Sequence, residues 1–220
     1  MSFFSTIKEN LLNIVFPVYC ISCEKKGSEL CLNCLSRSPE AERESAKWIF
    51  PCFDYRHPLI KKAIWLIKYK GRKRLVQVFA EILHGRILEE LSELFVMQNF
   101  HEPILIPIPL SKKRYRERGF NQAELLCKEL IKLQTPSPFT LSNNILIKIK
   151  ETEHQARIRD RSVRLKNIAN SFAVKNAELI KNRNIILIDD VTTTGATLTE
   201  AKKTLKDAGA RKVIAFTIAH

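Results

Sequence analysis

Two adjacent carboxylates, Asp189 and Asp190, stand between an apolar run and a loop rich in hydroxyl groups. The run, residues 185–188, has no polar interruption, which predicts a strand buried on both faces in a parallel sheet. In such sheets ligands bind beyond the carboxyl ends of the strands. Two neighbouring carboxylates repel each other, and a pair of vicinal ribose hydroxyls would give each of them a donor. We therefore expect Asp189 and Asp190 to contact a ribose.

The loop after these carboxylates has the composition of a phosphate-binding loop. Residues 192–197 offer four threonine hydroxyls, the flexible Gly195 and a run of backbone N–H groups. An amphipathic helix is predicted over residues 198–207, with Leu198, Ala201 and Leu205 on one face. A helix N-terminus presents free N–H groups and the positive end of the helix dipole to an anion. The segment therefore predicts a site for a phosphorylated sugar.

An ordinary strand–turn–helix, with a threonine as N-cap and aspartates as turn residues, is the structural alternative. The complete string favours the binding site over this alternative. It lacks the Gly-Lys-Thr of a P-loop and the three-glycine pattern of dinucleotide-binding folds. These absences argue against a nucleotide triphosphatase and a nicotinamide-dependent dehydrogenase.

Near the N-terminus, four cysteines form two Cys-x-x-Cys pairs. They are Cys20, Cys23, Cys31 and Cys34. Each pair places two thiolates on one side of a tight turn, and two such turns complete a tetrahedral four-sulfur site. In a cytoplasmic protein this pattern indicates structural zinc rather than disulfides, with a redox dithiol pair or chance spacing as the alternatives. So short a segment lacks a core of its own, and we expect metal binding to supply its folding energy.

Two further cysteines lie outside this pattern. Cys127 stands beside Leu126 in a predicted helix, which indicates a buried side chain that fills space in the core. The sequence assigns no role to Cys52.

The composition allows one sizeable core with a small appendage. The chain has 220 residues, 45% of them apolar, and a net charge of +14 from 37 basic and 23 acidic side chains. Such a charge suits phosphate ligands or nucleic acid, although a solvated basic surface would also produce it. The sequence shows neither a transmembrane run nor a signal peptide, so we expect a cytoplasmic protein. We expect a cysteine module in residues 1–50 and a larger domain in residues 51–220.

A basic segment with interleaved aromatic residues follows the cysteine module. Apolar residues at helical spacing predict a helix over residues 57–69, with Gly71 as its stop. Trp65 and Tyr69 alternate with a cluster of basic residues, a combination that suits single-stranded nucleic acid. The alternative is a basic helix end whose aromatic residues belong to the core. The candidate DNA-binding residues are Lys68, Lys70, Arg72 and Lys73.

A second basic segment lies between a predicted strand, residues 104–109, and a helix that begins near Asn121. We expect a loop there, in a position suited to phosphate, with a disordered basic turn as the alternative. Its candidate residues are Ser111, Arg114 and Arg118. From residue 103 onward strands alternate with helices, which predicts an α/β fold with a mostly parallel sheet.

The string that begins at Asp189 resembles the phosphoribosyl-pyrophosphate motif of type I phosphoribosyltransferases. The resemblance implies that Asp189 and Asp190 contact the ribose hydroxyls and that the ligand arrives with Mg²⁺. It also implies that the 5′-phosphate is wrapped by Thr192, Thr193, Thr194, Gly195, Ala196 and Thr197.

Four features in one order resemble the ComF family, the ComFC-like proteins of DNA uptake in naturally competent bacteria. They are the cysteine pairs, the Ile-Pro-Ile-Pro segment with its Arg-Gly-Phe-Asn-Gln ending, a Thr-x-x-Gln segment at residues 152–167, and the Asp-Asp string. The resemblance spans residues 16–219. It implies a zinc module on a type I phosphoribosyltransferase domain, a cytoplasmic role with incoming single-stranded DNA, and other DNA-uptake proteins as partners. By position, residues 111–118 would be the pyrophosphate loop and residues 152–167 the flexible loop.

Two functions remain open at this point. The first is a protein of natural transformation that handles single-stranded DNA and senses phosphoribosyl pyrophosphate. The second is an active phosphoribosyltransferase that acts on a base or amine, for which the sequence names no catalytic residue. A base-selecting hood would have to come from the N-terminal module or another chain, because His220 follows the last predicted strand. A zinc-stabilised adaptor with a vestigial site fits less well, since both carboxylates and all the loop threonines are present.

Overall fold

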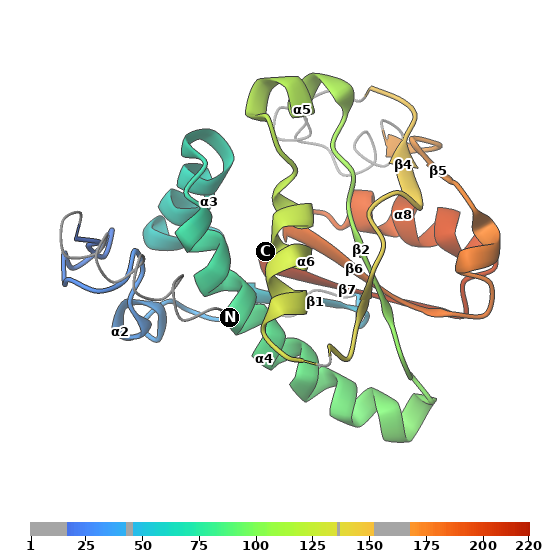
Figure 1. Ribbon diagram of the computed structural model, residues 1–220, viewed down its shortest axis with the longest axis horizontal. Coiled ribbons are helices and arrows are strands. Elements are labelled where there is room, and N and C mark those ends of the chain that lie inside the picture. Colours follow the sequence, from blue (N-terminus) through green and yellow to red (C-terminus); the bar gives the residue numbers. More distant parts are fainter. Residues whose placement is uncertain (1–16, 43–45, 136, 152–167) are drawn as a thin grey trace.

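The computed structural model describes residues 17–42, 46–135, 137–151 and 168–220. Figure 1 shows a twisted sheet with helices on both faces and a small N-terminal module beside it. The helices are α2 (Leu32–Leu35), α3 (Pro58–Lys70), α4 (Lys73–Gln98), α5 (Lys112–Arg118), α6 (Gln122–Lys132), the 3-10 helix η2 (Ala177–Leu179) and α8 (Ala196–Asp207). The strands are β1 (Ile49–Phe53), β2 (Ile104–Pro107), β3 (Thr140–Leu141), β4 (Leu146–Lys148), β5 (Phe172–Val174), β6 (Asn184–Val191) and β7 (Lys212–Ala219).

The main sheet has the order β1-β7-β6-β2-β3, and all its neighbours pair in parallel. Strand β6 is central, and its residues 185–188 are fully buried, as the uninterrupted apolar run predicts. Strands β4 and β5 form a separate antiparallel pair. The α/β fold with a mostly parallel sheet is therefore confirmed.

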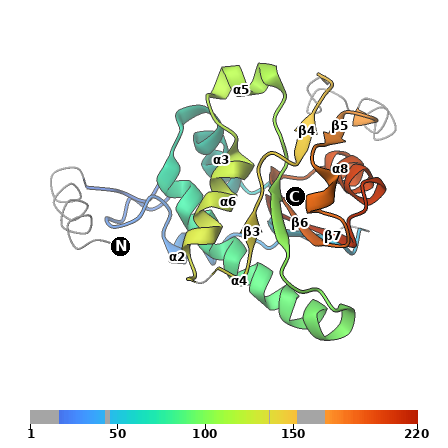
Figure 2. The same cartoon turned by 45° about the vertical axis from the view of Figure 1, so that its right-hand side comes forward.

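Alternation along β6 divides the core into two layers, because successive side chains of a strand point to opposite faces. Ile186 and Ile188 pack into the cluster that contains the buried residues of α3, α4 and α6. Ile185 and Leu187 pack into the cluster that contains the apolar face of α8. Figures 1 and 2 show α3, α4 and α6 on one face of the sheet and α8 on the other.

Helix α3 forms where its apolar spacing predicts it. Pro58 stands in its first turn, where the missing N–H has no helical partner. Ile60 and Ile64 are buried against the core. The helix ends at Gly71, whose φ of 60° is the left-handed conformation of a C-cap. The expected helix and its stop are both confirmed.

The basic segment before Asn121 is helical, contrary to the loop that we expected. Helix α5 has Ser111 as N-cap, where the Oγ accepts a hydrogen bond from the backbone N–H of Arg114, and it ends at the left-handed Gly119. The reason is local, since lysine, arginine and glutamate are good helix formers between a good N-cap and a C-cap glycine. Asn121 caps α6, as expected.

Strand β1 is an element that the sequence analysis did not predict. It pairs in parallel with β7 at one edge of the main sheet and carries the partly buried Cys52. Cys127 is fully buried in α6, as expected. Residues 152–167, where the flexible loop was expected, lie outside the described residues. Across the ranges given above, the helices include none long and apolar enough to cross a membrane.

The N-terminal module shares the core of the larger domain. Cys20, Leu30 and Leu35 are buried in the same cluster as α3 and α4. Glu29 is 7% exposed and pairs with Arg72 across 3.1 Å. The Nζ of Lys62 donates to the carbonyl oxygen of Ile21 across 2.8 Å. Apolar burial therefore contributes to the stability of this module, beyond anything that a metal adds.

A substitution of Gly195, at the start of α8, tests whether the turn after β6 has room for a side chain. Its φ is 70°, and an added Cβ would lie 3.3 Å from Cδ1 of Ile49. We expect Gly195→Ala to lower the free energy of unfolding by about 1–2 kcal/mol, because a side chain strains the left-handed backbone and crowds β1. Urea denaturation measures the change.

Gly85 provides the matched control for that substitution. It lies inside α4, and an added Cβ would meet no atom within 4 Å. Gly85→Ala should stabilise the protein by about 0.5–1 kcal/mol through helix propensity alone. Equal effects of the two substitutions would contradict the strained turn.

Candidate ligand-binding and metal sites

Asp189 and Asp190 belong to β6 itself, which continues to Val191. Alternation along the strand sends Asp190 to the face covered by α3, where its Oδ1 lies 3.0 Å from Nζ of Lys68. Both side chains of this ion pair are largely shielded, with 13% and 18% of their surfaces exposed. Asp189 points the other way, and its Oδ1 accepts a hydrogen bond from the backbone N–H of Asp190 across 2.9 Å.

The electrostatics of the pair follow from this arrangement. Burial, reinforced by the repulsion of Asp190, raises the pKa of Asp189 to about 7, against the attraction of Lys68 and Lys148. Burial and the nearby Arg114 lower the pKa of Lys148 to about 8. A donor that hydrogen-bonds the ionised carboxylate of Asp189 would therefore offset the unfavourable effect of burial on that charge.

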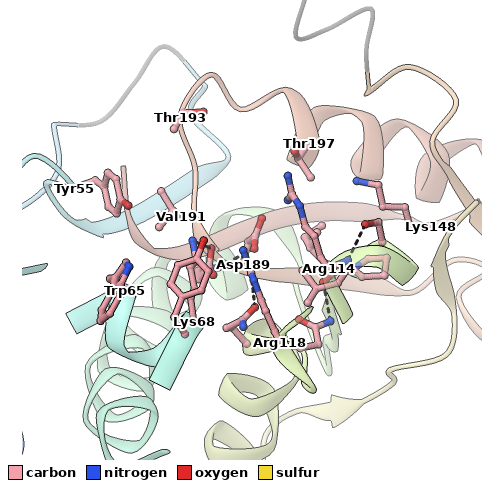
Figure 3. A pocket seen from close by; sticks show the side chains of 18 residues that line it. Tyr55, Trp65, Lys68, Arg114, Arg118, Lys148, Asp189, Val191, Thr193 and Thr197 are labelled. Atoms are coloured by element: carbon pink, nitrogen blue, oxygen red, sulfur yellow. Dashed lines mark hydrogen bonds and ion pairs between the residues drawn. The ribbon is translucent and has the colours of Figure 1, made fainter. Parts of the chain in front are cut away.

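A cavity of about 310 Å³ lies over the carboxyl ends of β6 and β2. Figure 3 shows Asp189 at its centre, with Lys68 and Trp65 on one side and Arg114 and Lys148 on the other. Of the candidate residues, the cavity is lined by Asp189, Asp190, Thr193, Thr197, Ser111, Arg114, Arg118 and Lys68. Residues from three separate candidate segments thus meet in one place.

Three of the four remaining loop residues border a smaller cavity of about 20 Å³ next to Asp189. It is lined by Thr192, Gly195 and Ala196 together with Thr193 and Thr197. Helix α8 begins at Ala196, two residues before the predicted start, so its N-terminus faces this cavity. Thr194 lines neither cavity, and its Oγ1 is buried without a hydrogen-bond partner in the described part of the chain.

Helices α5 and α6 hold the basic wall of the larger cavity. Nη1 of Arg118 donates to Oε1 of Gln122 across 2.9 Å. Asn121 fastens the turn between the helices, since its Nδ2 donates to the carbonyl oxygen of Ile108 and its Oδ1 accepts from the backbone N–H of Ala123. The Gly-Phe-Asn-Gln sequence therefore fixes the connection that orients Arg118.

The structure separates the four candidate DNA-binding residues. Lys68 reaches into the cavity and pairs with Asp190. Lys70 lies 5.9 Å from the ring centre of Trp65, Arg72 pairs with Glu29, and Lys73 is exposed in the first turn of α4. The basic segment therefore borders both the cavity and the N-terminal module.

Sequence reasoning missed two cavity residues, Lys148 and Tyr55. Lys148 ends the short strand β4, and a single lysine in an apolar strand carries no distinguishing signal. Tyr55 follows β1, the strand that was not predicted. An assignment of that strand could have pointed to Tyr55, because ligands bind beyond the carboxyl ends of parallel strands.

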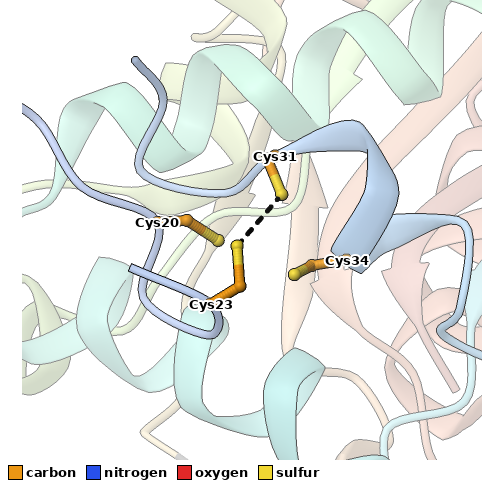
Figure 4. A group of neighbouring side chains, drawn as sticks. All are labelled: Cys20, Cys23, Cys31 and Cys34. Carbon is orange, nitrogen blue, oxygen red and sulfur yellow. Dashed lines mark hydrogen bonds between the residues drawn. The ribbon is translucent and has the colours of Figure 1, made fainter. Parts of the chain in front are cut away.

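The four N-terminal cysteines converge as the spacing predicts (Figure 4). Their Sγ atoms all lie within 4.8 Å of one another, and those of Cys23 and Cys31 are 3.6 Å apart. Sulfurs bound tetrahedrally to one zinc ion at 2.3 Å are about 3.8 Å apart, so this donor set fits such an ion. Cys52 and Cys127 are free thiols outside the cluster.

The raised pKa of Asp189 predicts a pH-dependent stability. An ordinary aspartate pKa of 3.8 in the unfolded chain and about 7 in the folded protein means that ionisation opposes folding. Stability should therefore fall as pH rises from about 3.8 to about 7. Asp189→Asn removes this charge and keeps an acceptor for the N–H of Asp190. We expect it to raise the free energy of unfolding by about 1–3 kcal/mol at alkaline pH and by much less under acid conditions.

Thermal or urea unfolding at several pH values measures this effect. Asp207→Asn is the control, because Asp207 is exposed at the far end of α8. A stability profile of Asp189→Asn that runs parallel to that of the unaltered protein would contradict the raised pKa.

Comparisons with known proteins identify a domain and a family. Residues 138–220 match the family model "Phosphoribosyl transferase domain". Competence protein F of Haemophilus influenzae is 32% identical over 213 residues, which cover 93% of this chain and 85% of that protein. Competence protein ComFC of Bacillus subtilis is 34% identical over 73% of this chain and 59% of its own length. DNA utilization protein YhgH of Escherichia coli is 28% identical over 83% of this chain and 74% of its own length.

The structure is also similar to a hypoxanthine phosphoribosyltransferase from Trypanosoma cruzi, with a TM-score of 0.40 and 10% identity over 64% of this chain and 63% of that one. A likeness of this size says nothing about substrate. The Haemophilus influenzae relative, in contrast, matches over most of both chains. The chain therefore belongs to the ComF family of competence proteins and carries a phosphoribosyltransferase domain.

Proposed function

We propose that this protein binds phosphoribosyl pyrophosphate with Mg²⁺ and handles single-stranded DNA in the cytoplasm during DNA uptake. The observation that carries the proposal is the convergence of Asp189, Asp190 and a wall of cations on one cavity of about 310 Å³. Phosphoribosyl pyrophosphate has vicinal hydroxyls between two phosphate groups, and the hydroxyls would face the carboxylates while one phosphate group faces the cations. The ComF relatives, named for competence and DNA utilization, support the DNA-uptake role.

The ligand fits by charge and by donor type. Ribose hydroxyls would donate to Asp189 and Asp190, which relieves the repulsion between them. The 5′-phosphate would lie at the small cavity beside the N-terminus of α8, which is lined by Thr192, Thr193, Gly195, Ala196 and Thr197. The pyrophosphate would lie against Arg114, Arg118 and the N-cap Ser111.

Mg²⁺ would arrive with the pyrophosphate and neutralise part of its charge. The donor set suits it, because carboxylate and phosphate oxygens are the ligands that Mg²⁺ prefers. Asp189 and Asp190 line the cavity, and their carboxylates would share in holding it. Lys68 pairs with Asp190 across 3.0 Å and so orients its carboxylate toward the cavity.

Catalysed phosphoribosyl transfer to a base or amine is the second candidate function. It is favoured by the cations on the pyrophosphate side, Arg114 and Arg118, which would stabilise the negative charge of departing pyrophosphate. The ribose carbon would pass through an oxocarbenium-like state while the carboxylates hold its hydroxyls. No residue is assigned as acid or base for the acceptor.

For the N-terminal module we propose a structural zinc ion held by Cys20, Cys23, Cys31 and Cys34. The ion would fix the two Cys-x-x-Cys turns against each other. We propose a module of residues 1–50 and a phosphoribosyltransferase-like domain of residues 51–220. Strand β1 joins them, since it begins at Ile49 and pairs with β7.

The ligand assignment predicts a loss of binding in the double variant Asp189→Asn with Asp190→Asn. Neutral amides accept weaker hydrogen bonds from the ribose hydroxyls than carboxylates do, and they carry no charge to attract Mg²⁺. The affinity for Mg²⁺-phosphoribosyl pyrophosphate should therefore fall by at least about 100-fold. Isothermal titration calorimetry measures it, and Asp207→Asn should bind as the unaltered chain does. Undiminished affinity of the double variant would reject the ribose site.

The same samples separate the two candidate functions. Pyrophosphate release from the Mg²⁺ complex, measured with a pool of bases and amines, should exceed that of the double variant only if the protein is a transferase. Binding without release favours the sensing role.

The zinc assignment predicts that Cys31→Ser lowers the bound zinc and destabilises the module. Removing one thiolate of four opens the site, and the zinc content by elemental analysis should fall well below one ion per chain. Cys127→Ala is the control, because Cys127 is buried in α6 away from the cluster. Native protein without zinc, or equal zinc in both variants, would rule the assignment out.

A further inference from the structure

The wall of the cavity formed by α3 carries two exposed aromatic rings that the sugar-phosphate site leaves unused. Trp65 and Tyr69 are one helical turn apart, and 48% and 54% of their surfaces are exposed. Their ring centres are 5.7 Å apart and their planes are inclined by 42°. Both line the cavity that contains Asp189 and Asp190. Two large rings held side by side in a polar cavity present a stacking surface, which core packing does not explain.

Cations surround these rings. The Nζ of Lys70 lies 5.9 Å from the ring centre of Trp65, and Cζ of Arg118 lies 5.6 Å from that of Tyr69. Arg118 comes from the opposite wall, at the end of α5. Aromatic faces beside positive charges are the features that bind single-stranded nucleic acid, because every unpaired base offers a π-face and every linkage a phosphate.

The stacking surface and the ribose site share one helix and one cavity. Lys68 lies between Trp65 and Tyr69 in sequence and forms the ion pair with Asp190. Arg118 lies over the Tyr69 ring and also lines the part of the cavity proposed for the pyrophosphate. A volume of about 310 Å³ lies at the lower end of the range for a single small ligand. It does not hold a sugar pyrophosphate and a nucleotide together.

We propose that an unpaired base of single-stranded DNA stacks on Trp65 and Tyr69 inside this cavity, so that the strand and phosphoribosyl pyrophosphate exclude each other. This inference rests on the proposed function and adds the regulation of that site. The phosphate next to the stacked base would take Arg118, which the pyrophosphate also needs, and Lys68, which otherwise pairs with Asp190. Cellular levels of the ligand would thus control how strongly the protein holds a strand.

Competition is tested by fluorescence anisotropy with a short labelled oligothymidylate. With Mg²⁺-phosphoribosyl pyrophosphate at ten times its own Kd, the apparent Kd for the strand should rise by about tenfold. In the Asp189→Asn, Asp190→Asn variant, which should not hold the ligand, addition of the ligand should leave strand affinity unchanged.

The stacking surface is tested in the absence of ligand. Trp65→Leu with Tyr69→Leu should weaken strand binding by about fivefold to a hundredfold, because a stacked base is lost. Trp65→Phe with Tyr69→Phe keeps two rings and should restore most of the affinity, which guards against misfolding of the leucine variant. Phe95→Leu is the matched control, since Phe95 is 55% exposed on α4 outside the cavity.

The outcomes separate this inference from the proposed function. A chain that binds both strand and ligand, but without competition, overturns the inference and leaves the proposed function in place. A chain that binds no strand, or no ligand, overturns both. If free thymidine or adenine quenches Trp65 fluorescence while the leucine variant keeps full strand affinity, the rings hold a free base, and the strand assignment is wrong.

Discussion

Two adjacent carboxylates at the end of a buried strand can coexist only if each finds a different environment. In this protein the pleat of β6 provides that separation, because it sends Asp190 toward α3 and Asp189 toward the N-terminus of α8. Asp190 gains the ammonium of Lys68 at 3.0 Å. Asp189 keeps a pKa of about 7, raised chiefly by burial. The two carboxylates are therefore unlike, since Asp190 has a lysine partner and Asp189 accepts a backbone hydrogen bond.

The surrounding elements of the fold place cations and a helix N-terminus next to the two carboxylates. Parallel strands β2 and β6 end at one edge of the sheet, so the helices that follow them begin there too. Helix α8 contributes its N-terminus, and α5 contributes arginines above β2. Helix α3 closes the third side with Lys68 and two aromatic rings. The site thus receives anion-binding groups from α5, which follows β2, and from α8, which follows β6. Helix α3 adds Lys68, the counter-charge of Asp190.

Sequence patterns predicted the parts of the site that are local and missed the parts that depend on packing. The strand at residues 185–188, the helix of α8 and the four converging cysteines follow from spacing within a few turns of chain. The ion pair between Lys68 and Asp190 does not, because it joins segments far apart in the sequence. For the same reason the basic residues near Lys68 read as one patch, whereas the structure distributes them between the cavity and the N-terminal module. Helix α5 was missed because a run of charges looks like a loop until its N-cap and C-cap are considered together.

The N-terminal module is coupled to the ligand cavity through α3. One face of this helix packs Ile60 and Ile64 into the cluster that holds Cys20, Leu30 and Cys34. Lys62 and Arg72 bind the module at Ile21 and Glu29, while Lys68 lies in the cavity. Helix α3 therefore connects the cysteine module to the cavity through continuous packing and polar contacts. A metal ion bound by the four cysteines would therefore support the ligand site as well as the module, because it would help to hold α3 at the distance from β6 that the Asp190 ion pair requires.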